Sequence, residues 1–290
     1  MGAQTSRAAL DHDISWYRTS LPPGVSAALH KKSDLRGAVQ TLGFLGMLAV
    51  TLLGAVTLAH AAPAASALCA LLYGMQANFL INGMHELGHE TVFKTRYLNG
   101  VFLRVVSFLG WLHPDMFFSS HLLHHRYTQN PPHDLENPTP IKITPASFFA
   151  AGFVDVQGAV GALVQTTRAA LGLFPTGHLG WLPEWEERIY GTDSRARLPA
   201  MLWAWVLLLG HATIAWLSVT RGNYVLPLLI SGGPFISGWL FFLCNSTQHV
   251  GLAPGKADFR LNSRTFLLHP LIRFWYWQMN FREWMRALHG

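Results

Sequence analysis

Two clusters of histidine residues have the spacing of a metal site. His85 and His89 are four positions apart, and a second cluster of His121, His124 and His125 follows. Residues three or four positions apart lie on one face of a helix, so each cluster can direct several imidazoles at one point. Imidazole ligands suit iron, zinc or copper. The spacing therefore predicts a histidine-ligated transition-metal site.

The first cluster has a second interpretation. The run from His85 to His89 contains Glu86 and also fits the His-Glu-x-x-His motif of zinc proteases, in which the glutamate acts as a base. A protease of that type would leave the second cluster unexplained. We therefore expect both clusters to belong to one site, and an intramembrane zinc protease is the remote alternative.

The composition predicts a membrane protein. Half of the residues (50%) are hydrophobic, only 12% are charged, and positions 37–84 contain no charged residue. A transmembrane helix needs about 20 apolar residues, which predicts four spans, at about 37–60, 64–84, 198–219 and 224–244. The predicted fold is all-α and integral to the membrane, with the spans paired in two hairpins. Residues 1–36 would form a cytosolic N-terminal segment, and residues 37–290 one membrane domain.

The basic residues predict how the spans are oriented. All but one of the 21 lysines and arginines, Arg221, lie in the two terminal segments or between the two hairpins. Cytosolic segments collect such residues, so we place both termini and the segment 85–197 in the cytosol. Apolar stretches at 98–112 and 145–174 suit interfacial helices, which would form a cytosolic cap that carries the histidines. The net charge of +6 then fits this topology and anionic lipids, and we expect no nucleic-acid partner.

The arrangement resembles a known family. A His-x-x-x-His cluster, a His-x-x-His-His cluster followed by Arg126, and flanking hydrophobic hairpins look like the membrane fatty-acid desaturases and related lipid hydroxylases. The resemblance covers residues 14–281. It implies two iron ions, O2 as co-substrate, an acyl lipid substrate and an external electron donor of cytochrome b5 or ferredoxin type. It also implies the endoplasmic reticulum in a eukaryote or the inner membrane in a bacterium, and lipid hydroxylation is an alternative to desaturation.

The resemblance also assigns roles to individual residues. The implied metal ligands are His85, His89, His121, His124, His125 and His249, with Asn245 acting through a water molecule. Candidates for orienting these ligands are Glu86, Glu90, Asp134, Glu136 and Gln248. Two assignments have structural alternatives. The acids in the loop after the second cluster also suit turns and loop caps, and the Asn245 pair also suits the capping of a helix end.

One expected motif is missing. Active members of the family carry a third cluster, His-x-x-His-His, immediately after a segment similar to Met279-Asn280-Phe281, whereas this chain places Arg282 and Arg286 about where its outer histidines would stand. Cations at a dicationic site are repelled. Three explanations follow: a gene model that is truncated or frame-shifted at its C-terminus, a non-catalytic relative, or an enzyme with a rebuilt site. Family membership is expected under all three, whereas activity of these 290 residues does not follow without the third cluster.

Overall fold

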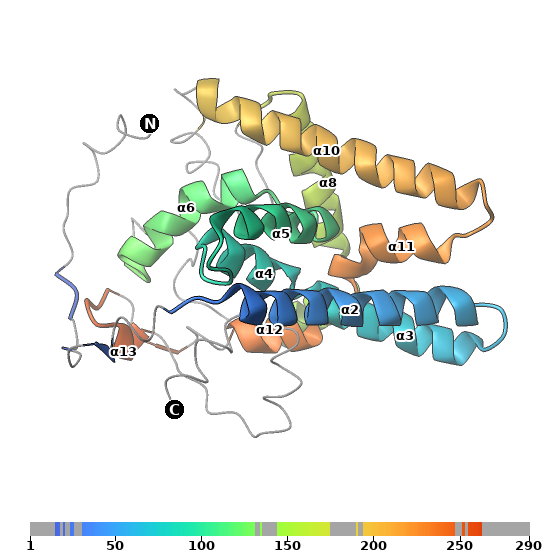
Figure 1. Cartoon of the computed structure of the whole chain (residues 1–290), viewed down its shortest axis with the longest axis horizontal. Helices are drawn as coiled ribbons and strands as arrows, with labels where there is room; N and C mark the ends of the chain where they lie inside the picture. The colour runs from blue at the N-terminus through green and yellow to red at the C-terminus, as the bar shows by residue number, and fades with distance from the viewer. Residues whose placement is uncertain are drawn as a thin grey trace.

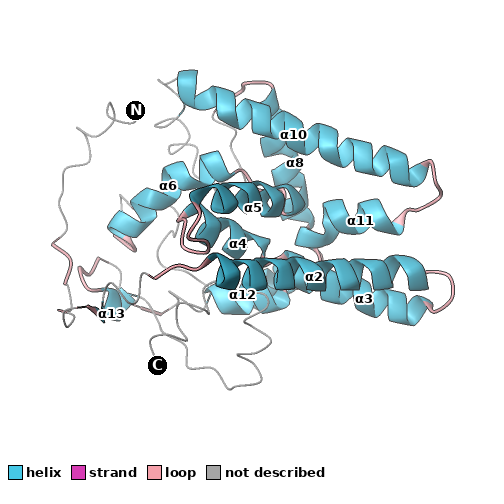
Figure 2. Ribbon diagram, in the orientation of Figure 1, coloured by secondary structure: helices cyan, strands magenta, loops and turns pink. Residues whose placement is uncertain are grey.

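The computed structural model describes residues 15–17, 20, 24–25, 31–130, 134, 144–174, 190, 194–246, 251–252 and 255–262. In this part of the chain every element is a helix (Figure 2), apart from an isolated β-bridge between Val154 and Ile236. The prediction of an all-helical fold is confirmed.

The first hairpin pairs α2 (Asp34–Leu58) with α3 (Pro63–Ala77), which run antiparallel along one side of the molecule (Figure 1). A small residue allows them to pack closely. A Cβ atom at Gly54 would lie 2.8 Å from the sulfur of Cys69. Polar groups join the same two helices, since the hydroxyl of Ser66 donates to the carbonyl of Ala55 at 2.6 Å and that of Thr51 to Gln76 Oε1 at 3.2 Å.

The second span is the central one. After a turn at Asn78, helix α3 continues into α4 (Leu80–Gly88), and together they form an apolar helix long enough to cross a membrane. Of its most apolar window, 44% is buried, against 22% for α2 and for the span in α10 (Ser194–Val219). Helices α2 and α10 are therefore covered less by the rest of the chain, and α4 carries the first histidine cluster into the interior.

A sharp bend separates the next two helices. Helices α5 (Arg96–Leu109) and α6 (Pro114–Tyr127) meet at 110°. The turn holds Trp111 in the left-handed region, with φ of 55°, and a proline opens α6, where its missing N–H is tolerated. Arg104 and Asp115 pair across the bend, with two N–O distances of 2.8 and 3.1 Å. The bend turns the second histidine cluster toward α4.

Helix α8 (Val156–Ala170) lies beside α10 (Figure 1), whereas α7 (Pro145–Gly152) packs against α12 (Trp239–Ser246). The side chain of Asp155 caps α8 by accepting a hydrogen bond of 2.7 Å from the backbone N–H of Gly158. A carboxylate also suits the positive end of a helix. Helix α8 packs on α10, and Gly158, Ala162 and Gln165 of α8 face the interior beside α4 and α6.

The predicted fourth span is broken. Helix α11 (Val225–Gly232) ends in a short 3-10 helix, η2 (Gly233–Phe235), and α12 (Trp239–Ser246) follows in a new segment, with α13 (Phe259–Asn262) beyond it. Pro234 lacks the N–H that would continue the helix. The released carbonyl of Ile236 accepts a hydrogen bond of 2.9 Å from the Asn78 side chain.

This break changes the number of spans. The described residues contain three helices that are long and apolar enough to span a membrane, or four if the bent α5–α6 pair counts as one. The single helix predicted at 224–244 is an interrupted one instead. The membrane character of the chain agrees with the prediction, since the span helices expose large apolar side chains such as Val50, Leu53 and Leu209.

Candidate metal centre

The first cluster lies in the last turn of α4. The helix ends in a Schellman turn, in which Thr91 N donates to the carbonyl of Glu86 (3.2 Å) and Glu90 adopts a left-handed φ of 57°. His85 and His89 therefore stand at the end of the central span. Their rings project from the same side of the helix, with centroids 4.6 Å apart.

Helix α6 crosses α4 at close range. A Cβ atom added to Gly88 would lie only 1.9 Å from the ring of Phe118, so the absence of a side chain at Gly88 lets the two helices approach. On the same helix the ring of Phe117 stacks on His121, with centroids 4.5 Å apart and planes at 19°. These contacts place the second cluster against the first.

Four of the predicted ligands come together. One ring nitrogen from each of His85, His89, His121 and His125 can be chosen so that all four lie within 4.8 Å of one another. Nitrogens bound tetrahedrally to one ion at about 2.1 Å are about 3.4 Å apart, so closure on an ion needs the ring nitrogens to approach one another by up to about 1.4 Å. Such a set of imidazoles fits iron, zinc or copper.

The cluster is electrostatically suited to a cation. Burial, and then the charges that the neighbouring histidines would carry, lower the pKa of His125 to about 3. His125 is therefore neutral at pH 7, and a neutral imidazole is the form that binds a metal. If all four rings were protonated, they would repel one another. In the neutral state, each of the four rings can offer a lone pair to the same metal ion.

Glu86 holds the first ligand in position. Its Oε1 lies 2.8 Å from Nδ1 of His85, and its Oε2 accepts a hydrogen bond of 2.9 Å from the hydroxyl of Thr91. Both Glu86 and His85 are buried. A carboxylate on Nδ1 fixes the ring so that Nε2 faces the metal, and it makes that nitrogen more basic.

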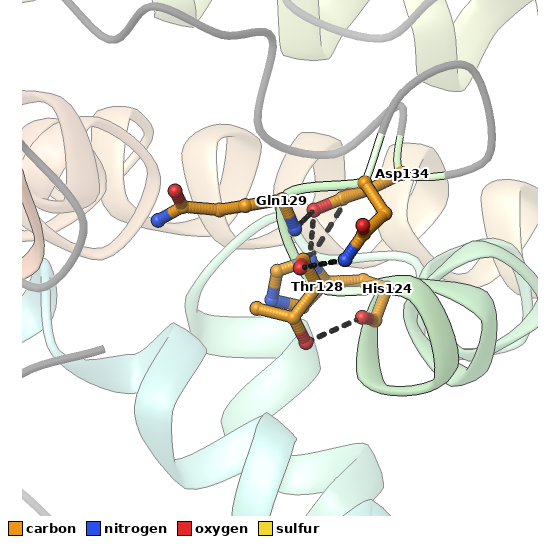
Figure 3. A network of polar contacts seen from close by, with 5 residues as sticks. His124, Thr128, Gln129 and Asp134 are labelled. Carbon is orange, nitrogen blue, oxygen red and sulfur yellow. Dashed lines mark hydrogen bonds and ion pairs between the residues drawn. The ribbon is translucent and has the colours of Figure 1, made fainter. Parts of the chain in front are cut away.

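The second cluster has a matching pair (Figure 3). Nδ1 of His124 lies 3.0 Å from both carboxylate oxygens of the buried Asp134, which also accepts a hydrogen bond of 2.6 Å from Gln129 N. The hydroxyl of Thr128 donates to the carbonyl of His124 at 2.8 Å. His124 is not part of the group of four nitrogens, so its ring is held separately beside that group.

The other predicted site residues have different positions. Asn245 is half-buried in the last turn of α12. Glu90 makes an exposed ion pair of 2.6 Å with Arg96, away from the ligand nitrogens. His249, Gln248 and Glu136 lie outside the described residues, as does the segment where a third cluster would be expected.

Two other buried histidines have structural roles that the sequence did not predict. His211 in α10 stacks on Trp111 at 4.2 Å, and its ring nitrogens bond Ser231 Oγ (2.8 Å) and the carbonyl of Phe108 (3.0 Å). His113 bonds the hydroxyl of Thr166 at 2.9 Å. Neither has a clustered histidine partner in the sequence, so spacing gave no signal for them.

A cavity of about 270 Å³ lies beside the four histidines. Its wall includes Met84, which directly precedes His85, and Phe117, which stacks on His121. Most of the lining is apolar and comes from α4, the α5–α6 turn, α6, α8, the break in the fourth span and α12, including Leu80, Ile81, Leu112, Met116, Ala162 and Phe241. The volume is slightly below that of common ligand pockets, about 300–1,000 Å³, and suits part of a lipid chain.

Comparison with known proteins gives one match. The family model described as fatty acid desaturase matches residues 60–282, most of the chain. That range contains both histidine clusters and nearly all of the cavity-lining helices. The comparisons find no curated protein and no solved structure that matches.

Proposed function

The chain belongs to the fatty acid desaturase family, and from this premise we propose that it is an O2-dependent oxidoreductase that desaturates an acyl lipid at a histidine-ligated di-iron site. The observation that carries the proposal is the group of four histidine nitrogens within 4.8 Å of one another. The family match supports a lipid substrate and a membrane setting, and the histidines support the metal.

The reaction needs reducing equivalents from outside. Two electrons and two protons join the two hydrogens of a methylene pair, O2 leaves as two water molecules, and a double bond remains in the chain. Bound iron would supply the activation of O2. We propose an external donor of cytochrome b5 or ferredoxin type, and the positive charge of exposed residues such as Lys256 and Arg126 would help to attract an acidic protein.

The protein supplies ligands and their orientation. His85, His89, His121 and His125 would hold metal, with Glu86 fixing the first of them. His124, oriented by Asp134, would join Asn245 and His249 in the proposed ligand set for a second ion. The apolar cavity would exclude water and present a methylene pair beside this centre.

The geometry of Glu86 speaks against the protease alternative. A protease of the His-Glu-x-x-His type needs this glutamate to act on a metal-bound water. Here both carboxylate oxygens are engaged, one by His85 Nδ1 and one by the Thr91 hydroxyl. The second histidine cluster, which such a protease does not need, lies in the same group of nitrogens.

The proposal is tested by metal content and product together. The full chain, purified in detergent and loaded with Fe(II) under nitrogen, should hold two irons per chain. With O2, a reducing donor and acyl lipid it should yield an unsaturated lipid detectable by mass spectrometry. A hydroxylated product would identify the lipid hydroxylase alternative, and iron without any product would identify a non-catalytic relative. A chain that binds no iron would refute the proposal.

A further inference from the structure

The last turn of α6 carries two histidines of the second cluster, His124 and His125. The last four carbonyl groups of a helix have no partner within the helix, so such a turn must be held by other groups. The hydroxyl of Thr128 donates to the carbonyl of His124 at 2.8 Å, and Asn130 N donates to that of Tyr127 at 2.7 Å. Both donors are close neighbours in the chain, so neither ties the turn to another part of the molecule.

A distant residue binds a third carbonyl of this turn. The indole N–H of Trp16, 110 positions earlier in the chain, donates to the carbonyl of Arg126 at 2.9 Å. Trp16 is half-buried, whereas Ser15 and Tyr17 on either side of it are exposed. Because Arg126 directly follows His125 in the chain, this hydrogen bond acts on the backbone of the turn next to the histidines.

The residue after Trp16 is bound to the segment that follows the fourth span. Tyr17 N donates to the carbonyl of Ala257 at 2.8 Å, and the guanidinium of Arg260 lies over the Tyr17 ring, 3.8 Å from its centroid. A cation over the face of an aromatic ring is attracted by it. Arg260 also pairs with Asp258, at 2.6 Å. The short N-terminal segment is therefore anchored to one part of the chain and binds α6 through its indole.

A backbone contact joins the same segment to the residues just after α6. Gly255 N donates to the carbonyl of Gln129 at 2.8 Å, and Gln129 N donates to the carboxylate of Asp134 at 2.6 Å. Asp134 is the acid that bonds Nδ1 of His124. Gln129 is buried and has a left-handed φ of 57°, a conformation that persists in a non-glycine residue only where its surroundings hold it. Three segments far apart in the sequence thus form one set of contacts around the end of α6.

We propose that Trp16 is a positioning residue of the metal centre: by binding a carbonyl in the last turn of α6, it fixes the directions of His124 and His125. The inference rests on the proposed function, in which these two imidazoles bind metal. Groups that orient metal ligands from outside contribute to metal affinity, because a ligand already in place need not be ordered when the ion binds. The same contacts join the turn to the segment beyond α12, whose last turn carries the proposed ligand Asn245.

The change Trp16→Phe tests the inference, since it removes the N–H and keeps an aromatic ring. The full chain in lipid nanodiscs is loaded with Co(II), and its affinity is measured by competition with a chelator. We expect the affinity to fall about two- to tenfold, the effect of one net hydrogen bond. The visible absorption bands of bound Co(II), which report ligand geometry, should also change. A bond that only stabilised the fold would leave this spectrum unchanged, so unchanged affinity and spectrum would overturn the proposal.

Trp216→Phe is the matched control. It makes the same substitution at a 66% exposed position in the last turn of α10, at the opposite end of the molecule from the end of α6 (Figure 1). Its Co(II) affinity and spectrum should equal those of the parent chain, and the same loss in both variants would contradict a specific role for Trp16.

A second measurement needs no metal. In the metal-free chain, amide hydrogen exchange of the peptide that covers residues 121–130 should be faster in Trp16→Phe than in the parent chain and the control. Unchanged exchange would overturn the inference even in a chain that binds metal. If the parent chain binds no metal, the proposed function fails and the exchange result alone decides the inference, so the two can fail separately.

Discussion

At the scale of single residues, two carboxylates define the geometry of the site. Glu86 and Asp134 each bond Nδ1 of a histidine, one in each cluster. Each cluster therefore contains one imidazole that is bonded to a buried carboxylate, and this bond fixes the tautomer and the direction of the ring. The exposed Glu90, only one residue beyond His89, has no such contact and pairs with Arg96.

Removing either buried carboxylate charge should weaken metal binding. Glu86→Gln and Asp134→Asn keep the shape of the side chain but lose the charge that makes the bonded imidazole more basic. We expect the affinity for Fe(II) to fall about 10- to 100-fold in each variant. Competition with a chelator measures the affinity. Glu90→Gln is the control and should bind like the parent chain; if all three variants bind alike, the orienting role is wrong.

The residue scale also shows what spacing alone predicts. The i, i+4 pair of His85 and His89 was sufficient to predict a shared face, and the structure places both beside His121 and His125. Spacing could not distinguish Glu86 from Glu90, because that choice depends on where the helix ends.

At the scale of elements, the approach of α4 to α6 decides whether the four imidazoles meet. That approach depends on Gly88, over which the ring of Phe118 lies. Most of the helices could be predicted from apolar length, whereas the break in the fourth span is marked by the Gly-Gly-Pro sequence at 232–234 but is missed by hydropathy. Hydropathy averages composition over a window, whereas the break is stabilised by Asn78 and by the backbone near Val154, far away in the sequence.

Gly88→Ala should force the two helices apart. The added methyl group overlaps Phe118, and overpacking of this kind costs about 1–3 kcal/mol of stability. We expect a lower thermal midpoint in detergent and weaker Fe(II) binding. Gly100→Ala is the matched control, because a Cβ at this exposed position in α5 meets nothing within 4 Å; it should be neutral or up to about 1 kcal/mol stabilising. Similar losses in both variants would contradict the role of close packing.

His211 is the polar connection between three helices. It joins α10 to α11 through Ser231 and to α5 through the carbonyl of Phe108. His211→Ala removes two hydrogen bonds and leaves a void beside Trp111, so the free energy of unfolding should fall by about 3 kcal/mol. Thermal unfolding in micelles measures it. The exposed His60, in the loop after α2, provides the control: His60→Ala should leave the midpoint unchanged, and an equal shift would exclude a special role for His211.

At the scale of the whole molecule, the two hairpin loops lie together at one end (Figure 1). The α2–α3 loop and the α10–α11 loop are at the right of that view, and the end of α6 and helix α13 are at the left. The one basic residue outside the predicted cytosolic segments, Arg221, belongs to the α10–α11 loop. The end of α6 and helix α13 belong to the predicted cytosolic segments, which hold the other basic residues, and they lie at the opposite end from the two hairpin loops. The positive-inside rule predicts this distribution of charge for a membrane protein.

This orientation can be tested by labelling. In a chain whose two native cysteines are replaced by alanine, Ala61→Cys and Thr220→Cys should react with a membrane-impermeant maleimide added to the non-cytosolic side of intact cells or sealed vesicles. Tyr97→Cys, at the start of α5 just after the first histidine cluster, should react only after the membrane is opened, because it lies at the opposite end. Tyr97 is 76% exposed, so its cysteine is accessible once the reagent can enter. Labelling of all three from the same side would refute the cytosolic placement of the histidine clusters.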